Sequence, residues 1–575
     1  MVPGPGRFIR SRIEAWSFVF LLVFVGLVAA LFYLQVFRGP HYRRVADRLH
    51  HRTWVLTAPR GTIFDRNGLP LALTVDAGSI FGDPSEIRDK QAAAASLAPI
   101  LNLSPGRVEE CLARRGRFAW LLRRADDDVV TRVKALKIKG IGVTGEQKRV
   151  YPMGVLAADT VGFVTANHGG AAGIEEALQR VLAGHDGRVW GEVDARGRII
   201  PGQRRVEQPP TAGRDVVLTL DSRLQEIAET CLDEAITRWK AAAGTVLVME
   251  PHTGEILALA NRPTFDPNDY RAYPAQRWVN RAVTFAYEPG STFKIVAISA
   301  ALEEGLYKPH DHVVYCRASL PVGRRVIHCV THGHGGHGDV DVTKLIVKSC
   351  NIGAATVGFR LGPQRLHRYL RKFGFGVKPD LGLSGQSAGS VPPADTWRDI
   401  TLANIAFGQS VSVTPAQLLA AYCAIANDGV RPHPHLVKRI EGGAGQPEQE
   451  IDLPGSRVIS PETARAVRKM LCGVVEKGTG TAAQIEGYQV AGKTGTAQKA
   501  LPGRGFTGGK FIGSFVGFVP ADNPKLAMIV ILDEPSGAHY GAVVAAPTWC
   551  EVAKRSLAYL GIPPTQVAKA VQAAP

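Results

Sequence analysis

Two polar residues stand at the start of an otherwise apolar segment, "YEPGSTFKIVAISAALEEG", residues 287–305. Pro289 and Gly290 interrupt the preceding chain, so Ser291 should fall in the first turn of a helix and Lys294 one turn further on the same side. A serine hydroxyl becomes a nucleophile when a base removes its proton, and a lysine amine can be that base when burial disfavours its charged form. The apolar residues around Lys294 predict such burial, and the helix N-terminus would stabilise an oxyanion.

The spacing Ser-x-x-Lys alone is weak, because a pattern with two fixed positions recurs by chance in a long chain. Two further segments make the pattern informative: "KSCN" at a helix-to-loop position and "VAGKTGTAQ" on a β-like run. The three motifs together are the signature of penicillin-binding proteins and class A β-lactamases. The two additional segments contribute the candidate residues Ser349, Asn351, Lys493, Thr494, Gly495 and Thr496.

A competing motif overlaps the last of these segments. "GYQVAGKT", residues 487–494, fits the phosphate-loop pattern, and "MIVILDE" further on resembles a strand that would hold Mg²⁺. A phosphate-binding loop must open into a helix whose N-terminus faces the anion. The chain continues instead with "GTAQKALPGRGFTGG", whose proline and glycines oppose a helix. We therefore reject an NTPase.

The N-terminal region contains a candidate membrane span. Residues 16–34 carry no charge, which suits a hydrocarbon core of roughly 30 Å crossed at about 1.5 Å per residue. A cleaved signal peptide is disfavoured because bulky "LFYLQVF" follows the apolar run. We expect a tail at 1–15 and an anchor at 16–37. Arginines flank the span on both sides, so charge alone does not determine its orientation.

The rest of the chain predicts two domains of an α+β protein. Short β-like runs and polar helices fill residues 38–210, and the segment "PGQRRVEQPPTAGR" reads as a linker. Residues 211–562 begin with a strand, an amphipathic helix near 221–240 and the hairpin "GTVLVME" and "GEILALA". They end with strands at "SFVGFVP" and "LAMIVILDE" and a helix at "TWCEVAKRSLAYLG". We expect the tail at 563–575 to be disordered.

The charge balance is strongly basic, with 68 lysines and arginines against 51 acidic residues and a net charge of +17. Arginines crowd in "LARRGRFAWLLRR", residues 112–124. Such a run could meet nucleic acid, anionic lipid or an anionic polymer, but a solvated face is the commoner explanation and the one we favour. Eight cysteines in 575 residues do not make a disulfide framework.

The sequence resembles a class B penicillin-binding protein over nearly its whole length. Beyond the three motifs, the resemblance rests on "RGTIFDRNG", "MEPHTGEILALANRPTFDPN" and "FGQSVSVTPAQLLAAY". "EGYQVAGKTGTAQK" and "HYGAVVAAP" are most similar to the division-type enzymes. The resemblance implies a β-rich pedestal domain of the dimerisation type, followed by a transpeptidase domain with an antiparallel sheet and flanking helices, like that of serine β-lactamases.

The implied activity is D,D-transpeptidation, in which Ser291 attacks the carbonyl between two terminal D-alanines and an amine of a neighbouring stem peptide resolves the acyl-enzyme. Lys294 is the implied base. Ser349 and Lys493 would form the proton path and keep Lys294 neutral, while Asn351 would bind the donor peptide amide.

Two threonines and two backbone groups complete the implied site. Thr494 and Thr496 would bind the substrate carboxylate, and the N–H groups of Ser291 and Thr496 would form the oxyanion hole. A penicillin-binding sensor or non-catalytic scaffold of the same fold is the alternative. A β-lactamase is disfavoured, because no glutamate motif for deacylation is evident.

The implied setting is the bacterial inner membrane, with a single span, the tail in the cytoplasm and the catalytic domain in the periplasm. Expected partners are stem peptides ending in D-Ala-D-Ala, β-lactams, a membrane glycosyltransferase and proteins of a division or elongation complex. Nucleic acid is not an expected partner, and the reaction itself requires no cofactor.

A cysteine- and histidine-rich segment lies between Ser291 and Ser349. Thiolates and imidazoles are zinc ligands, and Cys316, Cys329, His337 and Cys350 would make a closed structural set. The resemblance supports this, since some elongation-type relatives carry a zinc site ending at the cysteine of Ser-Cys-Asn. An oxidising exterior nevertheless favours a Cys316–Cys329 disulfide or free thiols over zinc. A soluble, glycine-rich loop is the third possibility.

Overall fold

The computed structural model describes residues 5–194, 199–443, 445–499 and 509–564, so most of the expected C-terminal tail lies outside the described residues. Contacts divide the chain into two compact units. Residues 1–59 and 184–212 form the first, and residues 60–183 and 213–575 the second. One junction between the units falls between residues 212 and 213, near the boundary expected at 210, whereas residues 60–183 of the expected first domain group with the C-terminal part of the chain.

The first unit begins with a long apolar helix. Helix α1 (Pro5–Phe32) passes through a π-helical turn at Tyr33–Phe37 and is followed by α2 (Gly39–His50). An 18-residue window within Ile9–Phe37 has a mean hydropathy of 2.7, and this stretch exposes its apolar side chains and is long enough to cross a membrane. The expected anchor at 16–37 therefore lies within α1 and the π-helical turn that continues it, and α1 begins before the uncharged run at residue 16. The unit also holds an antiparallel sheet of order β1-β6-β7 (His51–Leu56, Gly187–Val193 and Ile199–Gln208).

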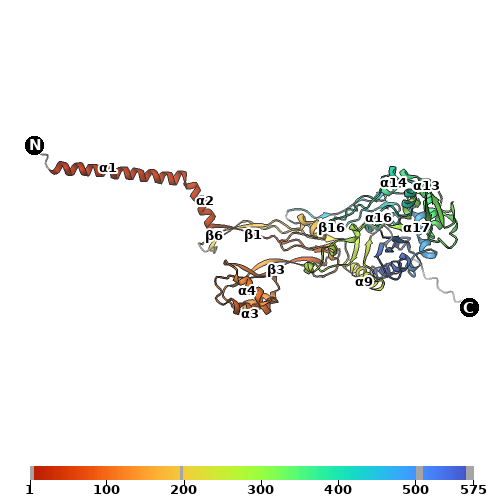
Figure 1. Cartoon of the computed structure of the whole chain (residues 1–575), viewed down its shortest axis with the longest axis horizontal. Coiled ribbons are helices and arrows are strands. Elements are labelled where there is room, and N and C mark those ends of the chain that lie inside the picture. Colours follow the sequence, from red (N-terminus) through yellow and green to blue (C-terminus); the bar gives the residue numbers. More distant parts are fainter. Residues whose placement is uncertain (1–4, 195–198, 444, 500–508, 565–575) are drawn as a thin grey trace. The chain divides into compact units, whose positions relative to one another are not determined.

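The second unit includes a small lobe, drawn in orange in Figure 1, with its own core. Its central strand β3 (Pro70–Gly82) pairs with β5 on one side and β4 on the other. Apolar residues of this sheet, including Ile80, pack against helix residues such as Leu97 and Val108. The surrounding elements are α3 (Lys90–Leu101), α4 (Pro105–Ala113), β4 (Ala119–Ala125), α5 (Asp127–Ala135) and β5 (Ile141–Val150).

The lobe is joined to the remainder of the second unit by a shared sheet. Strand β2 (Ile63–Phe64) pairs with β3 and, in parallel, with β8 (Val216–Leu218). Strand β8 pairs in turn with β16 (Val437–Ile440), which pairs with β17 (Gln449–Glu450). These backbone hydrogen bonds connect distant parts of the sequence, in agreement with the grouping of residues 60–183 with residues 213–575.

A five-stranded antiparallel sheet of order β10-β9-β21-β20-β19 is the centre of the second unit. The expected hairpin and the two expected C-terminal strands are confirmed. One face packs against α9 and α19, and the expected inward residues of α9, such as Leu224 and Leu232, are buried there. The elements are α9 (Ser222–Trp239), β9 (Ala243–Met249), β10 (Ile256–Arg262), β19 (Ala491–Gln498), β20 (Phe511–Val519), β21 (Leu526–Asp533) and α19 (Ala546–Tyr559).

The other face of the sheet is covered by a helical layer around two apolar helices (Figure 1). Every residue of α16 (Pro415–Ala426) is buried, and a capping box at Thr414 and Gln417 starts this helix. Helix α11 (Lys294–Glu303) is buried over most of its length. Packed with them are α12 (Val342–Val347), α13 (Asn351–Leu361), α14 (Pro363–Lys372), α15 (Asp399–Ala406) and α17 (Pro461–Lys477).

The segment that matched a phosphate-binding loop has the wrong structure for one. Lys493 and Thr494 lie inside β19, which continues to Gln498 and pairs with β20 along its length. No helix follows Thr494 within the described residues up to 499. The rejection of an NTPase is confirmed.

Candidate active site

Ser291 lies where a short 3-10 turn becomes a helix. The turn covers Gly290–Phe293, and α11 begins at Lys294. The expected order of serine and lysine at a helix start is confirmed, although the serine's turn is a 3-10 turn instead of the first α-helical one. Ser291 is half-buried and Lys294 is fully buried.

The amine of Lys294 is surrounded by oxygen atoms from three residues on two segments. Its Nζ is 2.9 Å from Ser291 Oγ, 2.7 Å from Asn351 Oδ1 and 2.8 Å from the carbonyl oxygen of Ser349. Ser349 Oγ is 3.2 Å away. The structure thus brings four of the expected catalytic residues into direct contact.

Burial lowers the pKa of Lys294 to about 8, although the thiols of Cys329 and Cys350 act in the opposite direction. An amine that loses its proton near neutral pH can accept the proton of a serine hydroxyl. The geometry and the pKa therefore both suit Lys294 to act as the general base toward Ser291.

Ser349 has an unusual backbone conformation. It lies between α12 and α13 with φ at +60°, in the left-handed region that costs a non-glycine residue roughly 1–2 kcal/mol. This conformation lets both its carbonyl oxygen and its hydroxyl face the amine of Lys294. The strained backbone of Ser349 therefore lies at the residue that holds the amine of Lys294 in place.

Lys493 reaches the site from β19 and is also fully buried. Burial, and then the positive charge of Lys294, hold the pKa of Lys493 well below the ordinary lysine value. Two amines buried near each other cannot both be protonated at low cost. Within the described residues the Nζ of Lys493 bonds only to the carbonyl oxygen of Thr494, at 3.4 Å, so the expected link from Ser349 to Lys493 is not a direct hydrogen bond.

Strand β19 approaches the nucleophile closely because two residues lack a side chain. A Cβ on Gly495 would lie 2.4 Å from Ser514 Oγ and 2.9 Å from Thr292 Cγ2. Gly290 has φ at +57°, and a Cβ there would meet the carbonyl oxygen of Thr496 at 3.1 Å. Glycine is therefore required at both positions for the strand to lie beside the turn.

The two threonines of β19 have partners that the sequence did not predict. The hydroxyls of Thr494 and Thr479 are hydrogen-bonded at 2.8 Å, and Thr496 Oγ1 accepts a hydrogen bond from the N–H of Gly541. Thr479 belongs to the run Gly-Thr-Gly-Thr at 478–481, and this run is the feature of the sequence that could have pointed to it. The fold thus places the hydroxyl of Thr479 next to Thr494, an expected carboxylate-binding residue.

Asn351 connects the lysine to the cysteine-rich segment. Its Oδ1 accepts from Lys294, and its Nδ2 donates to the carbonyl oxygen of His328 at 3.1 Å. Both ends of the amide are therefore engaged. Recognition of a donor peptide by Asn351, as the resemblance implies, requires one of these contacts to be exchanged for the substrate.

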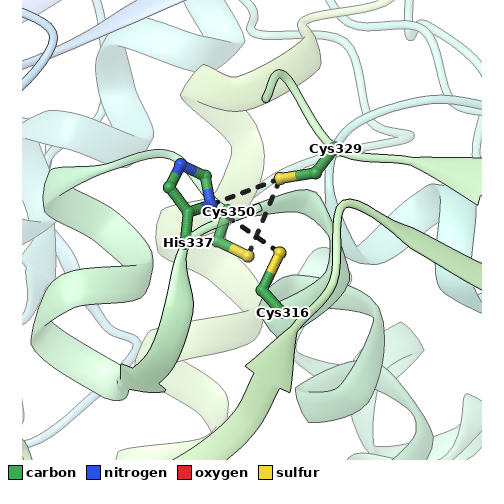
Figure 2. Close-up of side chains that lie close together, drawn as sticks. All are labelled: Cys316, Cys329, His337 and Cys350. Atoms are coloured by element: carbon green, nitrogen blue, oxygen red, sulfur yellow. Dashed lines mark hydrogen bonds between the residues drawn. The ribbon is translucent and has the colours of Figure 1, made fainter. Parts of the chain in front are cut away.

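The four expected metal ligands lie together (Figure 2). Their ligand atoms are all within 4.8 Å of one another, and the three cysteines are buried. Cys316 and Cys329 come from the strand segment β11 (His312–Cys316), β12 (Ser319–Val322) and β13 (Arg325–His328), and His337 precedes β14 (Gly338–Asp341). All eight cysteines are free, so the Cys316–Cys329 disulfide is not present.

Family models match both parts of the chain. Residues 244–556 match the penicillin binding protein transpeptidase domain, and residues 55–218 match the penicillin-binding protein dimerisation domain. The chain is 35% identical to "Probable peptidoglycan D,D-transpeptidase PenA" of Neisseria meningitidis, over 97% of this chain and 94% of that one. It is 30% identical to "Peptidoglycan D,D-transpeptidase FtsI" of Escherichia coli, over 97% and 93%.

A solved structure is also similar. Penicillin binding protein 3 of Mycobacterium tuberculosis, complexed with aztreonam, has a TM-score of 0.69 and 32% identity. The match covers 90% of this chain and all of that one.

The pKa of Lys294 predicts how the reactivity of Ser291 depends on pH. The neutral amine is the base, so the rate of acylation by a fluorescent penicillin should rise with pH and level off above about 8. Between pH 6 and 8 the second-order rate constant should increase about 50-fold, the change in the neutral fraction of one group. Circular dichroism at each pH controls for unfolding. A rate that stays constant from pH 6 to 9 would show that Lys294 is not the base.

The contact between Thr479 and Thr494 predicts a role in recognition. Thr479→Val removes one hydrogen bond of about 1 kcal/mol, which corresponds to about a fivefold loss in acylation efficiency. The loss should lie in binding, not in the rate of the bound complex, and Thr479→Ser should retain near-normal efficiency. Acylation measured over a range of penicillin concentrations separates the two. A loss in Thr479→Ser with normal efficiency in Thr479→Val would instead indicate a packing role for the methyl group.

Proposed function

Since this chain belongs to the penicillin-binding proteins that join a dimerisation domain to a transpeptidase domain, we propose how its own residues carry the reaction of that family. The chain is a serine D,D-transpeptidase that cross-links peptidoglycan stem peptides and is acylated by β-lactams. The observation that carries the residue assignment is the buried amine of Lys294, 2.9 Å from Ser291 Oγ.

Acylation follows from that contact. Neutral Lys294 takes the hydroxyl proton of Ser291 as Oγ bonds to the carbonyl carbon between the two D-alanines. The N–H groups of Ser291 and Thr496 hold the resulting oxyanion. When the carbon–nitrogen bond breaks, the terminal D-alanine leaves as an amine and carries away the proton.

The proton reaches the leaving amine through Ser349. Its Oγ lies 3.2 Å from Lys294 Nζ and is therefore placed to pass a proton between the lysine and a substrate nitrogen. Lys493, buried beside this pair, disfavours a second positive charge and so opposes storage of the proton on Lys294. The acceptor amine of a second stem peptide then attacks the ester and returns the proton to Ser291 Oγ.

Strand β19 supplies the binding edge for the donor peptide. It is the last strand of its sheet, so one side of its backbone is open to an added strand. Thr494, fixed by Thr479, and Thr496 would bind the terminal carboxylate on this edge. Extended D-Ala-D-Ala ends and β-lactams would share this position.

The N-terminal helix makes the chain a membrane-anchored protein. We assign residues before the span to the cytoplasm and the catalytic unit to the periplasm, where stem peptides are cross-linked. The phrases "EGYQVAGKTGTAQK" and "HYGAVVAAP" support action at division. Neither matched family model is a glycosyltransferase, so a membrane glycosyltransferase partner would supply the glycan strands.

Replacement of the nucleophile tests the assignment. Ser291→Ala should abolish the covalent adduct with fluorescent penicillin and the release of D-alanine from stem peptides, because no oxygen remains to be acylated. Ser299→Ala is the matched control: Ser299 lies in α11, directly after the turn that holds Ser291, is buried, and has a hydroxyl without a hydrogen-bond partner among the described residues.

The control variant should label normally, and both variants should unfold at nearly the same temperature as the natural protein. A persistent adduct in Ser291→Ala would place the nucleophile elsewhere. A stable adduct without D-alanine release in the natural protein would instead favour a penicillin-binding sensor.

We also propose that Cys316, Cys329, His337 and Cys350 bind one structural zinc ion. Tetrahedral zinc with bonds of about 2.3 Å to sulfur and about 2.0 Å to nitrogen places its ligands about 3.8 Å (S···S) and about 3.5 Å (S···N) apart. In this structure Cys329 and Cys350 Sγ are 3.8 Å apart, and His337 Nδ1 is 3.4 Å from Cys329 and 3.8 Å from Cys316 (Figure 2).

Four protein ligands leave no open position, so the metal would hold structure and take no part in the reaction. Its effect would be local to the active site. Cys350 lies between Ser349 and Asn351, both of which contact Lys294, and its Sγ accepts a hydrogen bond from Gly353 at the start of α13. His328, which accepts from Asn351, precedes Cys329.

Metal analysis of protein purified without a histidine tag and without added zinc tests this proposal. About one zinc per chain is expected, and Cys329→Ser should lose most of it and lower the unfolding temperature. Cys472→Ser, at a buried cysteine in α17, is the control and should retain the metal. A metal-free protein with eight titratable thiols, or a Cys316–Cys329 disulfide found by mass spectrometry, would contradict the proposal.

A further inference from the structure

A second polar constellation lies away from the nucleophile, in a cleft of about 550 Å³. The cleft is bounded by β4 and β5 of the small lobe and by the segment Pro267–Ala272. Five cationic side chains line it, against the single carboxylate of Asp269. These cations are Arg123, Arg124, Lys148, Arg149 and Arg271.

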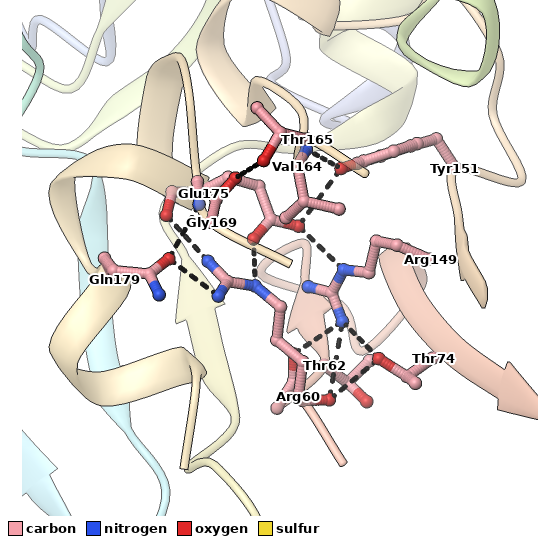
Figure 3. Close-up of polar contacts among 12 residues, drawn as sticks. Arg60, Thr62, Thr74, Arg149, Tyr151, Val164, Thr165, Gly169, Glu175 and Gln179 are labelled. Carbon is pink, nitrogen blue, oxygen red and sulfur yellow. Dashed lines mark hydrogen bonds and ion pairs between the residues drawn. The ribbon is translucent and has the colours of Figure 1, made fainter. Parts of the chain in front are cut away.

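Arg149 belongs to a buried group with an excess of positive charge. Its Nε donates to Glu175 Oε1 at 2.7 Å, and Arg60 Nε donates to the other oxygen of the same carboxylate at 2.5 Å (Figure 3). All three side chains are at most 5% exposed. One carboxylate therefore faces two guanidinium groups, and Arg149 Nη2 has no hydrogen-bond partner in the part of the chain that the structure describes.

Arg124 has no carboxylate within ion-pair distance among the described residues. Its Nη2 lies 2.7 Å from the carbonyl oxygen of Ala166 and 2.8 Å from His168 Nε2. Its Nε is buried without a hydrogen-bond partner among the residues of the described ranges, and burial is the main reason that its pKa is lowered. A half-buried guanidinium group that makes no ion pair with a described residue favours an anion in the cleft.

The remaining cations are only partly neutralised. Arg123 pairs with Glu146, and Lys148 pairs with the exposed Asp126 at 2.5 Å. Arg271 lies over the ring of Tyr270 and has no ion pair in the described part of the chain. Counting Arg60, six cations stand against Asp126, Glu146, Glu175 and Asp269, a net charge of two positive.

Strand β4 extends from this cleft to an exposed aromatic cluster. Phe118 is 51% exposed, stacks on Phe81 at 5.0 Å and meets Trp120 edge-on at 4.7 Å. Within the described ranges, strand β4 is the last strand in its sheet and pairs only with β3. An open strand edge beside aromatic and arginine side chains is typical of a surface that binds an extended polypeptide.

The arginine-rich run of the sequence therefore separates into two parts. Arg114 and Arg115 are exposed, in agreement with a solvated face, and Arg117 pairs with Asp83. Arg123 and Arg124 line the cleft instead. The exposed pair provides a charge-matched control for the cleft pair.

We propose that the cleft and the open edge of β4 bind an extended acidic segment of a partner protein, with its carboxylates at Arg124 and Arg271 and its apolar side chains at Phe118. This site is separate from the nucleophile, so it neither depends on the proposed catalytic roles nor alters them.

The test uses the full-length protein in detergent and a short fluorescein-labelled peptide of alternating glutamate and valine. Fluorescence anisotropy should show saturable binding that weakens as salt is raised, and the same peptide with lysine for glutamate should not bind. The double variant Arg124→Gln with Arg271→Gln should weaken binding about tenfold or more, whereas Arg114→Gln with Arg115→Gln should change it less than about twofold.

Both variants should react with fluorescent penicillin at the natural rate, which shows that each is folded. If the double variant does not fold, Arg271→Gln alone replaces it, because Arg271 is exposed and makes no ion pair within the described residues. Equal loss in the cleft and control variants, or no binding of the acidic peptide, would overturn the proposal. Soluble uncross-linked glycan strands that bind the cleft more tightly and displace the peptide would also overturn it.

Discussion

The amine of Lys294 must be excluded from water while it remains within hydrogen-bond distance of four oxygen atoms. Burial favours the neutral form and the electrostatic effect of Cys329 and Cys350 favours the charged form, which together give the lysine a pKa of about 8. In water the same group would remain protonated near neutral pH, and Ser291 would lack a base. The packing of α11, the turn at Ser349 and strand β19 around this amine is therefore what makes the serine reactive.

That arrangement requires close backbone approaches that ordinary residues would prevent. Glycine at 290 and 495 lets β19 lie against the nucleophile turn, and Ser349 adopts a left-handed conformation to direct two oxygens at one amine. Such local strain is tolerated because the surrounding elements over-determine the geometry. The eight-residue pairing of β19 with β20 and the buried helix α11 provide this support.

The cysteine cluster also helps to position Lys294. Cys350 lies between two residues that contact Lys294, and the carbonyl oxygen of His328, next to Cys329, accepts from the amide of Asn351. The position of the base thus depends on a segment with little regular structure, composed of strands of four or five residues. Covalent or metal cross-links are common where short strands cannot bury a sufficient core of their own.

Local sequence determined the elements that carry the chemistry. The proline and glycine before Ser291 and the apolar run after it specify the helix start, and the alternating or continuous apolar runs specify the hairpin and the final strands. The motifs were recognisable because each occupies a few consecutive residues. The ligand set Cys316, Cys329, His337 and Cys350 could likewise be proposed from residue types alone.

Tertiary structure decided which of these residues meet, since that depends on contacts between segments tens to hundreds of residues apart. The pairing of β2 with β8 groups residues 60–183 with the C-terminal part of the chain, although the sequence placed them in one domain with residues 38–59. Only the fold places Thr479 beside Thr494, and Lys493 within β19 near Lys294. A sequence specifies residue types and local periodicity, but burial and distance, which set the pKa of Lys294, arise only when the chain is packed.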